Sequence, residues 1–274
     1  MTSGSVASRD ERFGAVTAAL LAVSPFERGG YVRSCAAGAL VASGLGRHAG
    51  IGATCRIDAE GESLLAEVVG FGERGATLAP YGEPRGVVPG ARVALDPGAA
   101  SLWPCRDWAG RVLDALGRPA DGGPPLPRGP RPYRVRAEPM AAARRTALGP
   151  RLPLGVRALD LFTPCREGQR MGVFAGSGVG KSTLTSMIAR GAEADVLVVG
   201  LIGERGRELN EFLENTLGRD GRARSVVVVA TSDQPPMMRR RAAYVTLAVA
   251  ECLRDLGLRV LCLMDRAAKT SWTG

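Results

Sequence analysis

The sequence predicts an α/β fold in which a small β-barrel precedes an incomplete parallel sheet. Continuous apolar runs at 195–202, 225–230 and 259–264 are typical of strands that are covered on both faces. The residues between these runs show helical periodicity, and strands that alternate with helices form parallel sheets. Ahead of them, residues 30–96 hold short apolar runs separated by Gly, Pro and charged turns, which favours a small barrel or sandwich.

The first predicted element is a helical segment within residues 1–28. Apolar side chains recur there at helical spacing, at Phe13, Val16, Leu20 and Leu21. Such a segment either docks a partner protein or packs on its own domain, and the residues leave both interpretations open.

Three further regions follow along the chain: the barrel at 29–97, a connector at 98–148 and the parallel-sheet domain at 149–274. Within the connector, residues 116–136 are so rich in Pro and Gly that they exclude a helix or a central strand. The last domain is predicted to begin with a buried strand at 171–175. A helix is expected just before the strand at 259–264, from the spacing of Val245, Val249, Cys252, Leu253 and Leu256.

Composition narrows the classes of protein without choosing among them. The net charge of +9 permits a nucleic acid, an anionic membrane surface or an acidic partner, but it also fits charge scattered over a soluble surface. The six cysteines form no C-x-x-C pair and His48 is the only histidine, so no zinc site is expected. Reduced thiols in a cytosolic protein are the better interpretation. No apolar run reaches the roughly 18 residues that a membrane span needs.

The stretch "AGSGVGKST" predicts a loop that holds phosphate. Its glycines let backbone N–H groups turn inward, and the helix that follows directs its positive end at the same point. Lys181 adds a charge for the β- and γ-phosphates, and Ser182 offers a hydroxyl to Mg²⁺. The predicted ATP-binding residues are Ala175, Gly176, Ser177, Gly178, Val179, Gly180, Lys181, Ser182 and Thr183.

Two carboxylates follow the next predicted strands. Glu204 comes directly after the run at 195–202, where a carboxylate can act as a general base or merely begin a helix. Asp265 ends the run at 259–264, and an acid at the tip of a buried strand is the usual second Mg²⁺ contact in phosphate-loop enzymes. A turn-forming aspartate is the alternative.

Several motifs together resemble the flagellar export ATPases, the type III secretion relatives of the rotary F-type catalytic subunit. They are "GQRMGVFAGSGVGKSTL", "GLIGERGRELNEFLE", "VVVVATSDQPPMMRRRAAYVTLAVAECLRD" and "LMD", with "GRVLDALGRPADGGPPLP" and "LGVRALDLFTPCREGQRMG" ahead of them. The resemblance runs from about residue 28 to Asp265. It implies an N-terminal β-barrel, a RecA-like ATPase domain and a C-terminal helical domain.

For the matching positions the resemblance implies catalytic roles and ATP and Mg²⁺ as ligands. Glu204 would be the catalytic carboxylate, assisted by Lys181 and Arg205. Ser182, with Thr183 beside it, and Asp265 would hold the metal, and Glu208 would reach it through water. The non-catalytic F-type subunit is expected to carry Gln at the Glu204 position, so this chain resembles the hydrolysing kind.

The resemblance also implies partners and a location. The family forms a hexameric ring in the cytoplasm, peripheral to the inner membrane at the flagellar base. Export-gate proteins and cargo–chaperone complexes are its partners, and no nucleic acid is expected. Its N-terminal helical segment binds a regulator protein, which favours residues 9–24 as a docking element.

After Asp265 the sequence departs from the family pattern. The family would continue with a Ser/Thr-rich helix, further strands and the arginine that completes a neighbour's site, whereas this chain reads "RAAKTSWTG". We expect a truncated or frameshifted product. Because arginine fingers contribute roughly 10³–10⁵ in rate, this chain alone is expected to bind nucleotide weakly and hydrolyse it poorly.

Other functions remain open at this point. An injectisome secretion ATPase or a rotary synthase catalytic subunit would carry the same active site. A ring-shaped RNA helicase shares the RecA-like core, but residues 1–100 show no cluster of aromatics on which bases could stack. A fragment that binds a regulator without turning over ATP is the non-enzymatic alternative.

Overall fold

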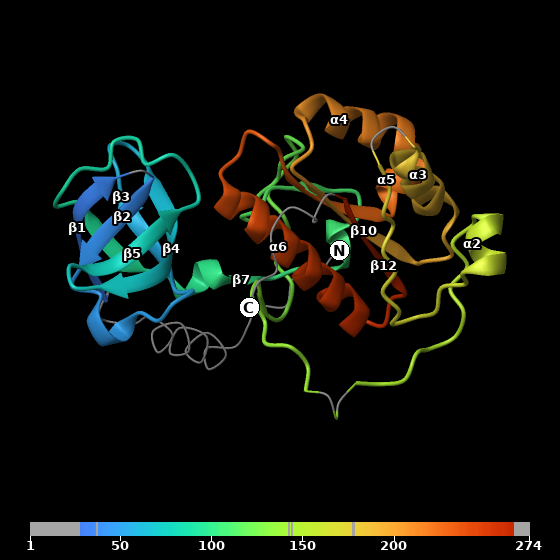
Figure 1. The fold of residues 1–274 in the computed structure, drawn as a ribbon, viewed down its shortest axis with the longest axis horizontal. Helices are drawn as coiled ribbons and strands as arrows, with labels where there is room; N and C mark the ends of the chain where they lie inside the picture. The colour runs from blue at the N-terminus through green and yellow to red at the C-terminus, as the bar shows by residue number, and fades with distance from the viewer. Residues whose placement is uncertain (1–27, 37, 142, 144, 177–178, 266–274) are drawn as a thin grey trace, which may run out of the picture.

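The computed structural model describes residues 28–36, 38–141, 143, 145–176 and 179–265. The predicted helix that contains Phe13 and Leu20 lies outside the described residues, as does the stretch after Asp265. Two bodies stand side by side in Figure 1, a small barrel and a larger α/β body.

The barrel is closed by six antiparallel strands, which confirms the predicted architecture. They are β1 (Gly29–Ala36), β2 (Ala39–Ser43), β3 (Thr54–Asp58), β4 (Ser63–Gly72), β5 (Gly75–Pro80) and β6 (Arg92–Leu95). The order around the barrel is β1-β2-β5-β4-β3-β6, and β6 pairs back with β1. Alternate side chains point inward, so Leu40, Ile57, Val68 and Leu78 are fully buried in one core.

One short helix, η1 (Gly46–His48), lies between β2 and β3 of the barrel. The connecting region holds two more, η2 (Pro97–Ala100) and η3 (Arg106–Trp108), and three two-residue strands. β7 (Ser101–Leu102) pairs with β9 (Tyr133–Arg134), and β8 (Val112–Leu113) pairs in parallel with β11 (Ser225–Ala230). The chain between the two bodies therefore supplies an edge strand to the sheet, which its Pro and Gly content did not reveal.

The second body contains the predicted parallel sheet. Its long strands are β10 (Val196–Ile202), β11 (Ser225–Ala230) and β12 (Val260–Asp265), and the order is β12-β10-β11-β8. The middle strand β10 is buried at every residue, as its continuous apolar run predicts. Leu201 of β10 lies opposite Asp265 of β12, so the carboxyl ends of these two strands meet at one edge.

Helices cover both faces of this sheet (Figure 1). They are α2 (Arg157–Phe162), α3 (Lys181–Gly191), α4 (Gly206–Glu211), the π-helical η5 (Phe212–Leu217), α5 (Gly218–Ala223) and α6 (Pro236–Asp255). α6 packs on one face, and α3 and η5 pack on the other. The approach of α6 is so close that a Cβ at Gly200 of β10 would lie 2.8 Å from Thr246 Oγ1.

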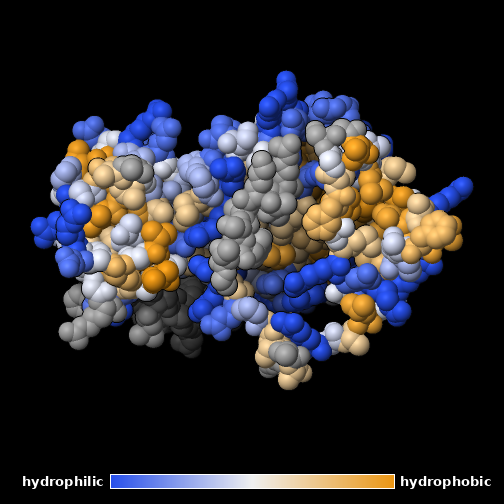
Figure 2. Space-filling model, in the orientation of Figure 1, coloured by the Kyte–Doolittle hydropathy of each residue, from blue (hydrophilic) through white to orange (hydrophobic). Residues whose placement is uncertain are grey.

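The prediction of a buried strand at 171–175 is wrong. The segment has no strand assignment, and Phe174 is 91% exposed. A strand needs a neighbouring ladder, and among the described residues the sheet ends at β12 without pairing to this segment. Met171 and Val173 of this segment are exposed as well, as are Leu161 and Phe162 of α2. Figure 2 shows apolar surface on the right of the molecule, the side on which α2 lies in Figure 1.

All six cysteines are free, and Cys55, Cys165 and Cys252 are buried. Burial raises the pKa of Cys55 to about 11, so its thiol stays protonated near neutral pH. Over the part of the chain that the structure describes, none of the helices combines the length and the apolar character that a bilayer crossing requires.

Candidate active site

A cleft of about 450 Å³ opens at the carboxyl ends of β10 and β12. α3 forms one wall, and the α4–η5 segment forms the other. Five of the residues that the sequence predicted line it together: Ser182, Thr183, Glu204, Glu208 and Asp265. Open parallel sheets bind ligands at this edge, because the strand ends and the helix starts meet there.

The start of α3 places a positive charge beside the cleft. Gly180 adopts φ of 96°, a left-handed conformation that favours glycine, and Lys181 is the first residue of the helix. The N-cap residue Gly180 has no side chain to cap this end, so it leaves the backbone N–H groups of the first turn available to an anion. The Lys181 ammonium pairs with Asp265 Oδ1. The pair joins the loop directly to the tip of β12.

Glu204 is held at the end of β10 by its backbone. The Gly203 N–H donates to the carbonyl of Ala230 at 2.6 Å, and the Ser232 N–H donates to the carbonyl of Glu204 at 3.0 Å. The Glu204 side chain is half-buried and lines the cleft. The loop after β11 thus fixes the backbone from which this carboxylate extends.

The remaining predicted residues are less enclosed. Glu208 lies in the first turn of α4 and lines the cleft, whereas Arg205, at the N-cap of that helix, is exposed and does not line it. Ala175, Gly176 and Val179 are exposed, and Ser177 and Gly178 lie outside the described residues.

Sequence reasoning missed polar residues on both walls of the cleft. They are Thr185, Ser186, Arg190, Glu211, Asn215 and Thr216. Ser186 Oγ lies 3.1 Å from Thr216 Oγ1 and so joins the two walls. A signal was present, since Ser182, Ser186 and Arg190 are spaced four residues apart and share one helix face.

The chemistry of the lining fits Mg²⁺. Among the described residues no group of three or more His, Cys, Asp or Glu side chains forms a metal cage. Mg²⁺ does not require one, because it is usually held by one or two carboxylates together with substrate phosphates and water. A Ser182 hydroxyl and the Asp265 carboxylate in one cleft are hard oxygen donors of that kind.

Comparison with known proteins identifies the family. The model of the ATP synthase alpha/beta family nucleotide-binding domain matches residues 155–272, and the model of the family's beta-barrel domain matches residues 35–94. A flagellum-specific ATP synthase from Caulobacter vibrioides is 52% identical over 230 residues, which cover 84% of this chain and 52% of the relative. A type 3 secretion system ATPase from Xanthomonas euvesicatoria is 47% identical over 230 residues, covering 78% of this chain and 49% of that protein.

Solved structures agree with this assignment. The assembled ATPase EscN from the enteropathogenic E. coli type III secretion system superposes with a TM-score of 0.75 at 37% identity, covering 86% of this chain and 56% of EscN. EscN in complex with its central stalk EscO gives a TM-score of 0.76 at the same identity, covering 86% of this chain and 57% of that one. The chain spans about half the length of the curated relatives it matches. With both family models matched in order, and with relatives at this level of identity, the chain belongs to the ATP synthase alpha/beta family and groups with its flagellum-specific and type 3 secretion members.

Proposed function

We propose that the chain binds MgATP in the β10–β12 cleft and contributes the hydrolytic site of a type III export ATPase. One observation carries the proposal: the cleft gathers the Ser182 hydroxyl and the carboxylates of Glu204 and Asp265 at one edge of the sheet, and the Lys181 ammonium pairs with that Asp265. Phosphoryl transfer depends mainly on positioning and on charge stabilisation, and these groups supply both.

Binding is assigned to the loop and to the start of α3. The Lys181 ammonium would exchange Asp265 for the β- and γ-phosphates, and the backbone N–H groups of the first turn of α3 would cradle them. Ser182, with Thr183 beside it, and Asp265 would hold Mg²⁺, and Glu208 would reach the ion through water. When bound, Mg²⁺ supplies neutralisation of the phosphate charge.

Hydrolysis is assigned to Glu204. Its carboxylate lies at the tip of the strand beside β12, where it can accept a proton from a water aimed at the γ-phosphate. Glu208, one helical turn further on, would orient that water. Arg205 is exposed here, so we propose that it acts only when a ligand or a neighbouring subunit closes on α4.

The cellular role follows from the relatives. We propose ATP-driven export of flagellar proteins by a hexameric ring in the cytoplasm, peripheral to the inner membrane at the flagellar base. Export-gate proteins and cargo–chaperone complexes are the proposed partners, and residues 1–28 the docking segment for a regulator. The relatives named flagellum-specific ATP synthase support the flagellar assignment, with identities of 41–52%.

An injectisome ATPase is the second candidate. Two relatives named type 3 secretion system ATPase reach 47% and 43% identity, close to the flagellar values. The site residues are the same in either case, so the difference concerns partners and not chemistry.

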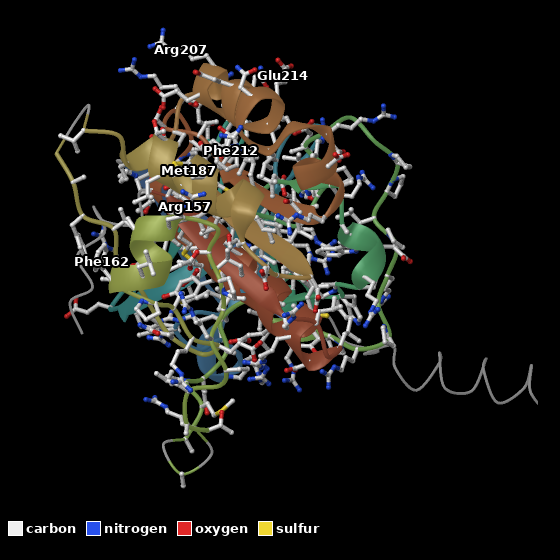
Figure 3. The ribbon with its side chains drawn as sticks, turned by 90° about the vertical axis from the view of Figure 1, so that its right-hand side faces the viewer. Arg157, Phe162, Met187, Arg207, Phe212 and Glu214 are labelled. Atoms are coloured by element: carbon white, nitrogen blue, oxygen red, sulfur yellow. The ribbon has the colours of Figure 1, made fainter. Side chains whose placement is uncertain are left out.

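Phosphate release tests the assignment of Glu204. We expect the 274-residue chain to bind ATP and to release phosphate slowly, and Glu204→Gln to lower that release by about 10²-fold or more while ATP binding persists. Glu214→Gln is the matched control, because Glu214 is an exposed carboxylate on η5 that does not line the cleft (Figure 3). Equal phosphate release from the wild type and Glu204→Gln would contradict the assignment.

A further inference from the structure

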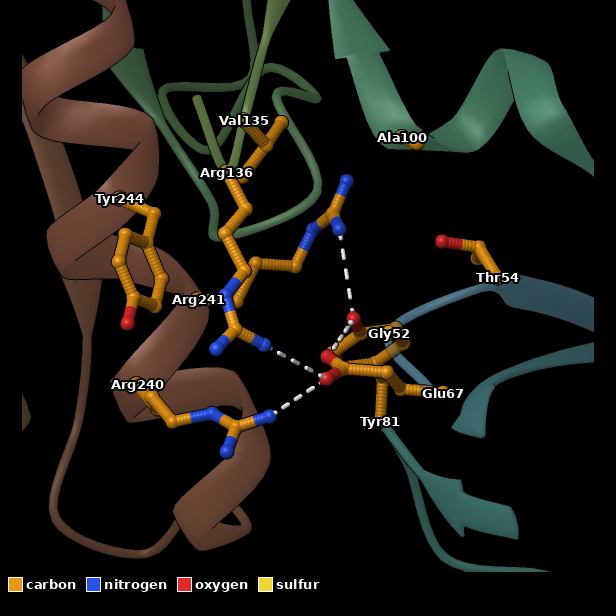
Figure 4. A pocket seen from close by; sticks show the side chains of 10 residues that line it. All are labelled: Gly52, Thr54, Glu67, Tyr81, Ala100, Val135, Arg136, Arg240, Arg241 and Tyr244. Carbon is orange, nitrogen blue, oxygen red and sulfur yellow. Dashed lines mark hydrogen bonds and ion pairs between the residues drawn. The ribbon is translucent and has the colours of Figure 1, made fainter. Parts of the chain in front are cut away.

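A partly buried cluster of polar and charged residues joins the barrel to the N-terminal end of α6 (Figure 4). Glu67 of β4 accepts a hydrogen bond from Arg240 Nη2 at 2.7 Å on Oε1, and one from the Tyr81 hydroxyl at 2.8 Å on Oε2. Arg136 Nη1 lies 3.8 Å from the same Oε1. We refer to Glu67, Tyr81, Arg240 and Arg241 as the clasp.

Arg241 anchors the clasp on the side of the α/β body. It is 7% exposed, and its guanidinium donates to the carbonyls of Ala115 at 3.0 Å and Ala99 at 2.5 Å. Its Nη1 also lies 3.4 Å from the Tyr81 hydroxyl. One side chain of α6 therefore contacts the barrel, the segment after it and the start of the α/β body.

The carboxylate of Glu67 is the only negative charge in the clasp, and the Glu67 side chain is 12% exposed. Removing one partner of a buried pair is costly, because the other charge stays buried without compensation. The adjoining cavity measures about 40 Å³, far below the size of a metabolite site. The cluster therefore serves contact between the two bodies and not binding of a small molecule.

The same end of α6 is linked by a loop to Glu204, at the end of β10. The loop at 231–235 runs directly into α6, and the N–H groups of Met238 and Arg239 donate back to the carbonyl of Pro235. From that loop, Ser232 holds the carbonyl of Glu204 at 3.0 Å. Less than two turns of α6, followed by the loop back to Ser232, separate the clasp arginines from this hydrogen bond.

We propose that the clasp positions Glu204: the barrel fixes the first turns of α6 through Glu67, and α6 fixes the Ser232–Glu204 backbone contact at the cleft. Glu67, Arg240 and Arg241 are then positioning residues that act through the loop and touch no substrate. The inference rests on the proposed role of Glu204, but the contact between Ser232 and Glu204 can be measured without any turnover.

Hydrogen exchange of the 274-residue chain tests the proposal. In Glu67→Gln we expect the amides of Ser232 and Gly203 to exchange about tenfold faster or more, because the loop opens locally. Amides in the middle of β10 and β11, such as Val198 and Val228, should keep their rates. Glu62→Gln is the matched control, since Glu62 is an exposed carboxylate in the turn between β3 and β4.

A purely structural clasp would give a different result. The two bodies would separate and the melting temperature would fall, but the Ser232 and Gly203 amides would exchange at the wild-type rate, and that outcome overturns the proposal. If Glu67→Gln does not fold, the exchange rates of the same two amides are measured in Arg240→Gln instead. The Arg240 side chain is 40% exposed, so its loss is better tolerated. Titration of the wild type with a fluorescent ATP analogue tests the proposed function separately from the role of the clasp. If the wild type does not bind the analogue, the proposed function fails, while the exchange result for the clasp stands.

Discussion

At the scale of single residues, the pairing of Lys181 with Asp265 is the most informative contact. The two residues are 84 positions apart in sequence, and they belong to the loop and to the strand that phosphate-loop enzymes use for phosphate and metal. A polyphosphate would compete with Asp265 for the ammonium, and a divalent cation would take over the carboxylate. If the proposed assignment holds, the pair links nucleotide binding to metal binding.

This link predicts the behaviour of Asp265→Asn. Without Mg²⁺, the variant should bind an ATP analogue as tightly as the wild type or more tightly, because a negative charge that competes for Lys181 has been removed. With Mg²⁺, the wild type should gain affinity and the variant should gain little. Titrations with Mg²⁺ and with EDTA measure the difference.

Asp220→Asn serves as the control for this experiment, since Asp220 is an exposed carboxylate on α5. This variant should gain as much affinity for the ATP analogue from Mg²⁺ as the wild type does. An Asp265→Asn variant with an undiminished Mg²⁺ effect would remove Asp265 from the metal site.

At the scale of elements, Asp121 fastens the connector to the sheet. It accepts hydrogen bonds from Arg111 Nε at 2.7 Å and Nη2 at 3.0 Å, and from the N–H groups of Val112 and Gly123. These donors hold the pKa of its carboxyl well below the usual range, with the Arg111 hydrogen bonds as the largest cause. The two-residue strand β8 depends on this contact, because Val112 begins it.

Asp121→Asn is expected to lower the melting temperature at pH 7 by roughly 3–8 °C. Because the pKa of Asp121 is lower in the folded chain than in the unfolded one, its stabilisation is complete above about pH 4 and is lost as the pH falls below that value. The difference in melting temperature between the variant and the wild type should therefore become smaller in acid. The exposed pair Glu83–Arg85 provides the control, and Glu83→Gln should melt like the wild type.

The sequence predicted the long elements well and the short ones poorly. β10, β11, β12 and α6 follow from apolar runs and periodicity, because each buries a whole face against the others. β8 was not predicted, because two residues are too few to show the alternation of apolar and polar side chains that marks a strand. Its position also depends on the hydrogen bonds of Asp121. The segment 171–175 was predicted as a strand because its residues are apolar. A strand also needs a neighbouring strand to hydrogen-bond with, and the residues of the segment do not show whether one is present.

The residues of the candidate site were also predicted only in part. The motif and the acids at the strand tips were found because the carboxyl ends of adjacent parallel strands must meet. The clasp was not found, because nothing local in the sequence relates Glu67 to Arg240, which lies 173 residues later. Three consecutive arginines, 239–241, are a pattern typical of a solvated helix start, whereas Arg241 is buried.

At the scale of the whole molecule, the chain consists of two bodies with separate cores, joined by the connector and the clasp. The barrel contacts the first turns of α6, and the cleft lies at the carboxyl ends of β10 and β12. A change in the orientation of the barrel would reach the cleft through α6 and the loop at 231–235.

The central claim is that Lys181 and the start of α3 hold the phosphates of ATP. Titration of the 274-residue chain with a fluorescent ATP analogue in Mg²⁺ tests it directly, comparing the wild type with Lys181→Ala and with the control Arg207→Ala, whose side chain is exposed on α4 (Figure 3). We predict a loss of affinity of roughly 10- to 100-fold for Lys181→Ala, as expected when a charged hydrogen bond is removed, and no change for Arg207→Ala. Equal affinities for Lys181→Ala and the wild type would contradict the account.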